Sequence, residues 1–273
     1  MRLMKKVRAV CGKVFALCLC VVFAGFLCAC KDQSMVGDDL SAARTAVSLR
    51  DWSLAERLLE RYLREARDAD LRWEAWQQLL VVLNAAGQEP RATLEYLETM
   101  LAEFADNDAR SAVILRRMGE VNEGMRRYGR AADAWNAYIG LGGLSTEQTV
   151  EGYRRLAAMQ FYLRRFDAGE DTLQQCLALP LADHDKIMCM YDLADQNMAR
   201  ERWQEVSDLC QQILDSDPDK TLRGLTGYLL ADALEQLGKT KDALKNFELA
   251  RDDYPNPSVI DNRIAHLRKK LKK

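Results

Sequence analysis

Residues 225–255 read LTGYLLADALEQLGKTKDALKNFELARDDYP, and this stretch decides the fold. Two amphipathic segments flank a short Gly-Lys-Thr-Lys turn at residues 238–241. Spacings of three and four residues place the apolar side chains of each segment on one helical face: Leu230, Ala231 and Leu234 in the first, and Ala243, Phe247 and Ala250 in the second. Pro255 then stops further winding. We therefore predict two antiparallel helices that pack closely through their small residues.

The same pattern recurs upstream at intervals of 37 to 39 residues. With Ala243 as the reference, the equivalent positions are Ala55, Ala92, Ala131, Gly169, Val206 and Ala243. A second, mostly small column lies twelve residues earlier: Ala43, Leu80, Gly119, Ala157, Ala194 and Ala231. A mostly large column lies four residues after the reference: Leu59, Tyr96, Trp135, Leu173, Cys210 and Phe247. Interlocking helices alternate small and large volumes in this way.

Each unit resembles a tetratricopeptide repeat (TPR), a helical hairpin with a usual period of about 34 residues. The likeness rests on the small and aromatic positions just given and on the proline that follows the second helix. It implies an all-α protein with a TPR-like α-α superhelix of about six helical hairpins over residues 38–257. Residues 258–273 are then expected to form a C-terminal capping helix with a basic tail, because a repeat array needs a polar end.

Residues 1–29 have a different composition from the rest of the chain. They hold five basic residues, no acidic residue and an unbroken apolar run of 16 residues at 14–29, which is typical of a secretory signal peptide. The run ends in Leu27-Cys28-Ala29-Cys30, which resembles the lipobox of bacterial lipoproteins. That resemblance implies cleavage before Cys30, acylation of Cys30, and a lipid-anchored linker over residues 30–37. An ordinary signal peptide and an uncleaved, cysteine-rich anchor are the alternatives.

The expected location is the outer membrane, with the repeats facing the periplasm. Lys31 occupies the position where an aspartate favours the inner membrane in enteric bacteria, although the inner membrane stays open as an alternative. Removing residues 1–29 takes five of the 39 basic residues, so 34 remain against 41 acidic residues and the net charge is −7. An acidic chain of this kind is a poor binder of nucleic acid, and we expect no nucleic-acid partner.

Three cysteines lie beyond the leader, at Cys176, Cys189 and Cys210. An odd number argues against a disulfide framework. We interpret them as buried apolar residues, while a single bridge such as Cys176–Cys189 stays open in an oxidising periplasm.

The sequence contains no Gly-rich phosphate loop, no H-E-x-x-H and no G-x-S-x-G. Its two histidines, His184 and His266, have no nucleophile beside them, and neither has enough neighbouring ligands for a metal site. We therefore predict a protein that is not an enzyme and that has no cofactor, no metal and no catalytic residue.

TPR arrays bind partners in the groove lined by their first helices. Residues three before and one after the column that runs from Ala43 to Ala231 should face this groove. The last two units both read Tyr-x-Leu-Ala-Asp there, and we predict a partner-binding groove formed by Arg154, Tyr191, Asp195, Tyr228 and Asp232. The alternative is that the tyrosines pack against neighbouring helices and the carboxylates only solubilise the surface.

We predict a lipid-anchored, periplasm-facing TPR scaffold that mediates protein–protein interactions in cell-envelope assembly. In architecture it resembles the TPR lipoprotein of the outer-membrane β-barrel assembly machine and, about equally, the pilotin lipoproteins of pilus secretins. The alternative is a helical-repeat envelope enzyme that processes peptidoglycan or another glycan with groove carboxylates such as Asp195 and Asp232. A pocket that encloses both acids and raises their pKa values would favour the enzyme, whereas an open groove would favour the scaffold.

Overall fold

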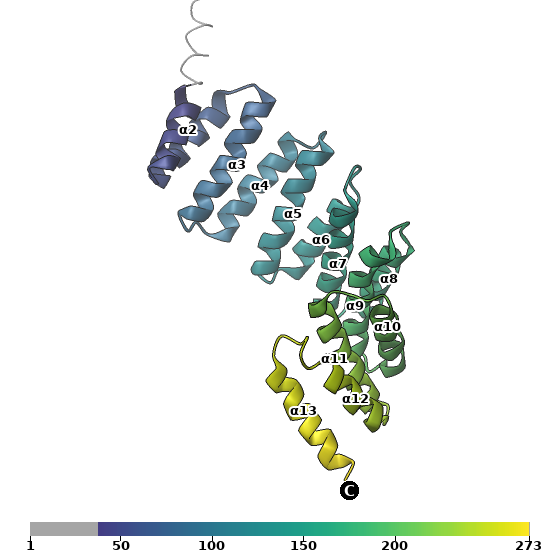
Figure 1. Cartoon of the computed structure of the whole chain (residues 1–273). Coiled ribbons are helices and arrows are strands. Elements are labelled where there is room, and N and C mark those ends of the chain that lie inside the picture. Colours follow the sequence, from purple (N-terminus) through teal and green to yellow (C-terminus); the bar gives the residue numbers. More distant parts are fainter. Residues whose placement is uncertain (1–37, 273) are drawn as a thin grey trace, which may run out of the picture. The chain divides into compact units, whose positions relative to one another are not determined.

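The computed structural model describes residues 38–272, which are helical with short connections and contain no β-strand. The predicted leader, Cys30 and the linker that follows it lie outside the described residues. A first helix covers residues 38–48. The later helices, labelled in Figure 1, are α2 (Trp52–Glu65), α3 (Ala69–Ala85), α4 (Pro90–Glu103), α5 (Asp108–Gly124), α6 (Tyr128–Ile139), α7 (Thr146–Tyr162), α8 (Phe166–Ala178), α9 (Asp183–Ala199), α10 (Trp203–Asp215), α11 (Lys220–Gln236), α12 (Thr240–Ala250) and α13 (Pro257–Lys270).

The turn inside each hairpin has one recurring geometry. A residue with positive φ stands five positions before the reference column in every unit: Arg50, Gly87, Arg126, Arg164, Glu201 and Gly238. The amide of the next residue donates a hydrogen bond back to the carbonyl five positions earlier, as Lys239 does to Leu234 at 2.9 Å and Arg165 does to Gln160 at 2.8 Å. This is the Schellman ending of a helix, and its repetition confirms the predicted register of the six hairpins.

The small columns are buried where the helices approach most closely. Ala131, Ala157, Ala194 and Ala231 are fully buried. At Gly119 even a Cβ would lie 2.6 Å from the Trp135 ring, which explains why the column holds glycine there. In the second hairpin the columns are less regular, because Leu80, Ala92 and Tyr96 are only half-buried. The Tyr96 hydroxyl there donates to Glu60 at 2.6 Å.

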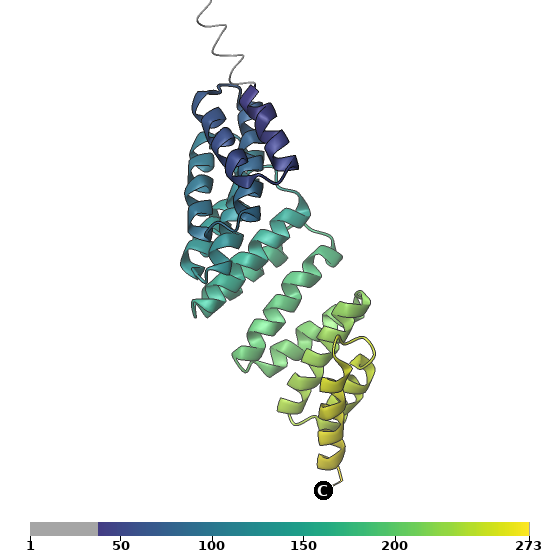
Figure 2. The same cartoon turned by 90° about the vertical axis from the view of Figure 1, so that its left-hand side faces the viewer.

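The chain divides within α4 into two compact units, one ending at Met100 and one beginning at Leu101. In the second unit, successive first helices pack on one another: α7 on α9, and α9 on α11. At the C-terminal end of the second unit, α13 packs against α12, as Figure 1 and Figure 2 both show. Ile260, Ile264 and Leu267 of α13 are buried in the apolar cluster of α11 and α12. The capping role predicted for the C-terminal residues is thus performed by a helix that begins at Pro257, since proline suits the first helical position.

A disulfide joins Cys176 at the end of α8 to Cys189 in α9, with the two Cα atoms 6.5 Å apart. The interpretation of all three cysteines as unbonded apolar residues is therefore wrong for this pair, because packing of α8 on α9 brings the two thiols together. Cys210 is free and buried, and burial raises the pKa of its thiol to about 12. It is consequently a neutral, unreactive thiol at physiological pH.

Within residues 38–272, every helix is too short or too polar to cross a bilayer.

Candidate functional site

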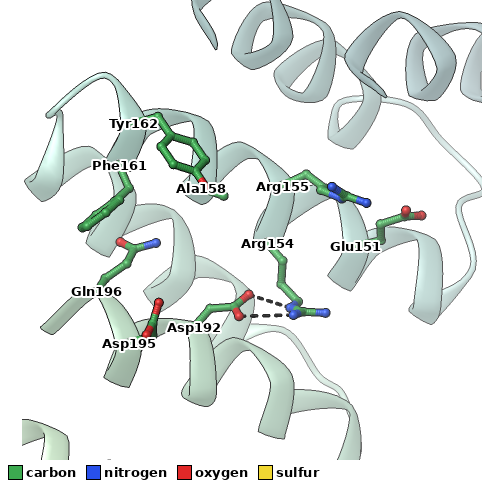
Figure 3. Close-up of a pocket in the computed structure, with 9 residues that line it drawn as sticks. All are labelled: Glu151, Arg154, Arg155, Ala158, Phe161, Tyr162, Asp192, Asp195 and Gln196. Atoms are coloured by element: carbon green, nitrogen blue, oxygen red, sulfur yellow. Dashed lines mark hydrogen bonds and ion pairs between the residues drawn. The ribbon is translucent and has the colours of Figure 1, made fainter. Parts of the chain in front are cut away.

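A pocket of about 360 Å³ lies between α7 and α9, the first helices of two consecutive hairpins in the second unit. Its lining comes from those two helices alone: Glu151, Arg154, Arg155, Ala158, Phe161 and Tyr162 on α7, and Asp192, Asp195 and Gln196 on α9. Figure 3 shows the aromatic rings, Asp195 and Gln196 toward one end of the pocket and the Arg154–Asp192 pair toward the other. The pocket therefore occupies the face on which a TPR groove is expected.

An ion pair between Arg154 and Asp192 joins the two walls of the pocket. The guanidinium donates through Nε to Oδ2 at 2.6 Å and through Nη2 to Oδ1 at 3.1 Å. Two-point pairing of this kind fixes the orientation of both side chains as well as their separation. The Arg154–Asp192 pair thus links the adjacent first helices α7 and α9.

The other charged residues of the pocket also have partners, with one exception. Glu151 accepts from Arg116 of α5, with Nη2 to Oε1 at 3.0 Å. Arg155 donates to Glu123 of α5 at 2.9 Å. Within residues 38–272, the Asp195 carboxylate accepts no hydrogen bond and forms no ion pair. The pocket therefore has one uncompensated negative charge.

The surroundings of Asp195 disfavour its ionised form. The carboxyl group is reached by solvent, yet protein surrounds it on several sides, and this partial burial raises the pKa of Asp195 above its usual value. The nearby carboxylate of Asp192 raises it further. A positive charge placed beside Asp195 would relieve both effects, because it would favour the charged form.

Aromatic side chains form one end of the pocket. Tyr162 is 58% exposed and stacks on Tyr128 of α6 with a centroid distance of 4.7 Å. Phe161 is half-buried and meets the edge of Phe166 at 5.3 Å. An exposed, stacked tyrosine at the mouth of a charged pocket is a rigid contact surface that loses little conformational entropy on binding.

The predicted groove residues fall into two groups. Arg154 and Asp195 line the pocket, together with Ala158, which directly follows Ala157 of the small column. Tyr191 lies outside the lining: it is half-buried and packs against the apolar clusters around α9 and α11. Burial raises the pKa of Tyr191 to about 12, with Asp195 and Asp192 adding to the shift.

Tyr228 and Asp232 are engaged within the chain. Tyr228 stacks on Tyr254 at 5.0 Å and meets the edge of Phe247 at 5.5 Å. Asp232 accepts a hydrogen bond from Arg263 of α13, which also donates to Glu235 at 2.8 Å. The α7–α9 pocket therefore contains Arg154 and Asp195, whereas Tyr228 and Asp232 are covered by neighbouring residues of the chain.

Sequence reasoning missed Glu151, Arg155, Tyr162, Asp192 and Gln196 as lining residues. A usable signal existed for the charged ones. Arg116 and Glu151 are 35 residues apart, and Arg154 and Asp192 are 38 apart, so each pair is separated by about one repeat. Opposite charges one repeat apart on the groove face lie side by side when the first helices stack.

The geometry does not bring together the predicted carboxylate pair of Asp195 and Asp232. Asp195 lines the pocket and Asp232 does not, because Asp232 is bound to α13. Among residues 38–272, no three histidine, cysteine, aspartate or glutamate side chains are grouped so that they could hold a metal ion.

Comparison with known proteins identifies the fold. No family model and no curated protein sequence matches the chain. Among solved structures, the apo form of RapI matches with a TM-score of 0.61 and 10% identity, over 87% of this chain and 72% of that one. A tetratricopeptide repeat protein from Parabacteroides merdae matches with a TM-score of 0.57 and 13% identity, over 87% and 88% of the two chains. Pseudomonas aeruginosa PilF matches with a TM-score of 0.52 and 12% identity, over 86% and 99%.

These identities are low enough that the likeness concerns the fold alone. The matching structures, the repeated turns and the buried small columns agree, and the predicted fold class is confirmed: the chain is an all-α helical-repeat protein with a TPR-like fold.

Proposed function

We propose that this protein is a scaffold that binds a segment of another envelope protein in its groove, while a lipid on Cys30 holds it at the periplasmic face of the outer membrane. The observation that carries the binding role is the α7–α9 pocket, which combines an unpaired carboxylate with exposed aromatic surface on the groove face. Such a mixture of one fixed charge and rigid rings is typical of anchor sites in protein interfaces.

The proposed location rests on two independent features. One is the lipobox-like sequence that ends in Cys30. The other is the buried Cys176–Cys189 bond, because structural disulfides form and persist in oxidising compartments such as the bacterial periplasm. The disulfide supports export of the protein from the cytoplasm, and it is compatible with an anchor in either membrane.

A scaffold role is favoured over an enzyme role because the charged pocket residues, Asp195 excepted, are neutralised by fixed partners. Glu151, Arg154, Arg155 and Asp192 are all held in ion pairs, and such side chains are poorly placed to exchange protons with a substrate.

Site-specific photo-crosslinking in intact cells tests the binding role. A photoreactive amino acid replaces Ala158 in the pocket, and in a matched control it replaces Asp171, an exposed residue of α8 outside the pocket lining. We expect one or a few envelope proteins to crosslink at position 158 and not at position 171. Equal crosslinking at both positions, or none at 158, would contradict the proposal.

Metabolic labelling with a fatty acid tests the anchor. Wild-type protein should carry the label and migrate as the cleaved form, while Cys30→Ala should be unlabelled and accumulate as a precursor. Fractionation of the two membranes then tests the outer-membrane assignment. An unlabelled wild type, or normal cleavage of Cys30→Ala, would refute lipid anchoring.

A further inference from the structure

We propose that the α7–α9 pocket receives one cationic side chain, a lysine or arginine of the bound segment, whose charged head pairs with Asp195 and whose stem lies against Phe161 and Tyr162. This inference rests on the proposed function, since it names the chemistry of the partner that the groove would bind.

Charge is the first argument. The pocket residues Arg154 and Arg155 are neutralised by Asp192 and Glu123, and Glu151 is neutralised by Arg116. Of the charged residues that line the pocket, Asp195 alone has no partner within residues 38–272. An anionic ligand would approach a net negative site whose arginines are already occupied, whereas a cation would complete the last pair.

Size and shape are the second argument. About 360 Å³ is near the lower end of the roughly 300–1,000 Å³ that small-molecule sites span. This volume holds one long side chain with accompanying water and is too small for an element of secondary structure. The walls are two fixed helices joined by the Arg154–Asp192 pair, so the site exists before the partner arrives.

The aromatic end is the third argument. Phe161 and Tyr162 line the pocket together with Asp195, and Tyr128 holds the Tyr162 ring in place from behind. Aromatic faces attract lysine and arginine through their quadrupole, and their apolar area accommodates the methylene stem. A carboxylate and aromatic rings in one pocket therefore favour a long cationic side chain over a neutral one.

The chain contains an internal example of this arrangement one repeat later. Asp232, which stands 37 residues after Asp195, is bound by Arg263 of α13, and the Arg263 guanidinium lies 5.3 Å from the centre of the Phe247 ring. At the position equivalent to Asp195, Arg263 of α13 thus pairs with the Asp232 carboxylate beside the ring of Phe247. At Asp195 no such residue comes from within the described chain, so the partner supplies it.

Peptide selection tests the inference without a known partner. Full-length protein in detergent, with its disulfide intact, is used to select from a phage library of random dodecapeptides. Parallel selections use Asp195→Asn, which removes the charge at constant shape, and Asp171→Asn, which removes the same charge from an exposed position outside the pocket. Selected peptides are mapped by crosslinking from position 158.

We expect wild type and Asp171→Asn to enrich peptides with lysine or arginine at one fixed position, and Asp195→Asn to lose that enrichment. Replacing this residue by glutamine should weaken binding to wild type at least about tenfold, because the pair is charge-assisted and partly shielded from water. The same replacement should weaken binding to Asp195→Asn by a clearly smaller factor, since the pair with Asp195 is already absent and only the attraction to the aromatic rings is lost.

Peptides that crosslink at position 158 but lack a fixed basic residue would overturn this inference and leave the scaffold function standing. So would a basic residue whose loss weakens binding equally to wild type and Asp195→Asn. Failure to select any peptide that crosslinks at position 158 would overturn both the inference and the binding role on which it rests.

Discussion

The segments Tyr191–Asp195 in α9 and Tyr228–Asp232 in α11 are nearly the same sequence, YDLAD and YLLAD, at equivalent places in successive hairpins. Their environments differ. In α11, Tyr254 stacks on the tyrosine and Arg263 binds the aspartate. In α9, the second aspartate of the segment, Asp195, has no partner within the described residues and faces the α7–α9 pocket. A repeated motif therefore has one role where the following elements cover it and another where they do not.

The two segments are also secured by different means. The α9 helix is bonded to α8 through Cys176–Cys189, whereas α11 is covered by the apolar face of α13. Removing either support should affect mainly the hairpin that depends on it, because each repeat contacts only its neighbours. The predictions below use this difference, from the largest effect to the smallest.

Deleting residues 256–273 should have the largest effect. It removes the buried side chains of Ile260, Ile264 and Leu267, each worth about 1.5–3 kcal/mol on burial, so we expect a loss of roughly 5 kcal/mol. Hydrogen exchange should show α11 and α12 losing protection first, while α5 to α8 keep theirs. Uniform loss of protection from α5 to α12 would contradict a local role for α13.

Reducing the disulfide should have the next largest effect. The bond closes a separation of 13 residues, and loops of this size contribute about 3 kcal/mol. Urea unfolding with and without reductant measures the loss. The double variant Cys176→Ala with Cys189→Ala is the control, and its midpoint should not respond to reductant.

Asp232→Asn should lower stability by about 1–2 kcal/mol, because it leaves Arg263 with a weaker acceptor beside Glu235 in a partly exposed setting. The urea midpoint at neutral pH measures this change. An unchanged midpoint would mean that Glu235 alone satisfies Arg263.

Asp195→Asn should have the smallest effect and the opposite sign. In the wild type, the pKa of Asp195 is raised in the folded state. Between the usual carboxyl pKa and this raised value, the folded state therefore binds more protons than the unfolded state. Wild-type stability therefore falls as pH rises through that window, and the asparagine variant avoids the loss. We expect a slightly higher melting temperature at neutral pH and no difference below the usual carboxyl pKa. A lower melting temperature at neutral pH would show that Asp195 has a structural partner.

The fold could be predicted from the sequence because each hairpin repeats the same volumes at the same interval. Ala131, Ala194 and Ala231 are buried where their column requires a small side chain. The turns follow from the same register, although four of the six positive-φ positions hold arginine or glutamate rather than glycine. The residue types at those four positions do not indicate a positive φ, so these turns can be located only from the repeat interval.

The candidate site could be predicted only in part. Groove-facing positions follow from helical spacing, and this was enough to find Arg154 and Asp195. The choice of ion-pair partners depends on the distance between successive first helices. That distance cannot be deduced from the residue spacing within one helix. The covering of Tyr228 and Asp232 depends on where α13 packs, and the joining of Cys176 to Cys189 depends on the packing of α8 on α9.

The C-terminal helix also bears on assembly of the protein with itself. A repeat array that ends on a bare apolar face offers the next copy a surface to continue the stack, and a head-to-tail contact of that kind does not close and grows into filaments. Here α13 covers the apolar cluster of α11 and α12, and Arg268 and Lys270 in its last turn form ion pairs with Glu248 of α12 and Glu235 of α11. Because α13 covers the apolar cluster of α11 and α12, that surface is not available for a second copy of the chain to stack on.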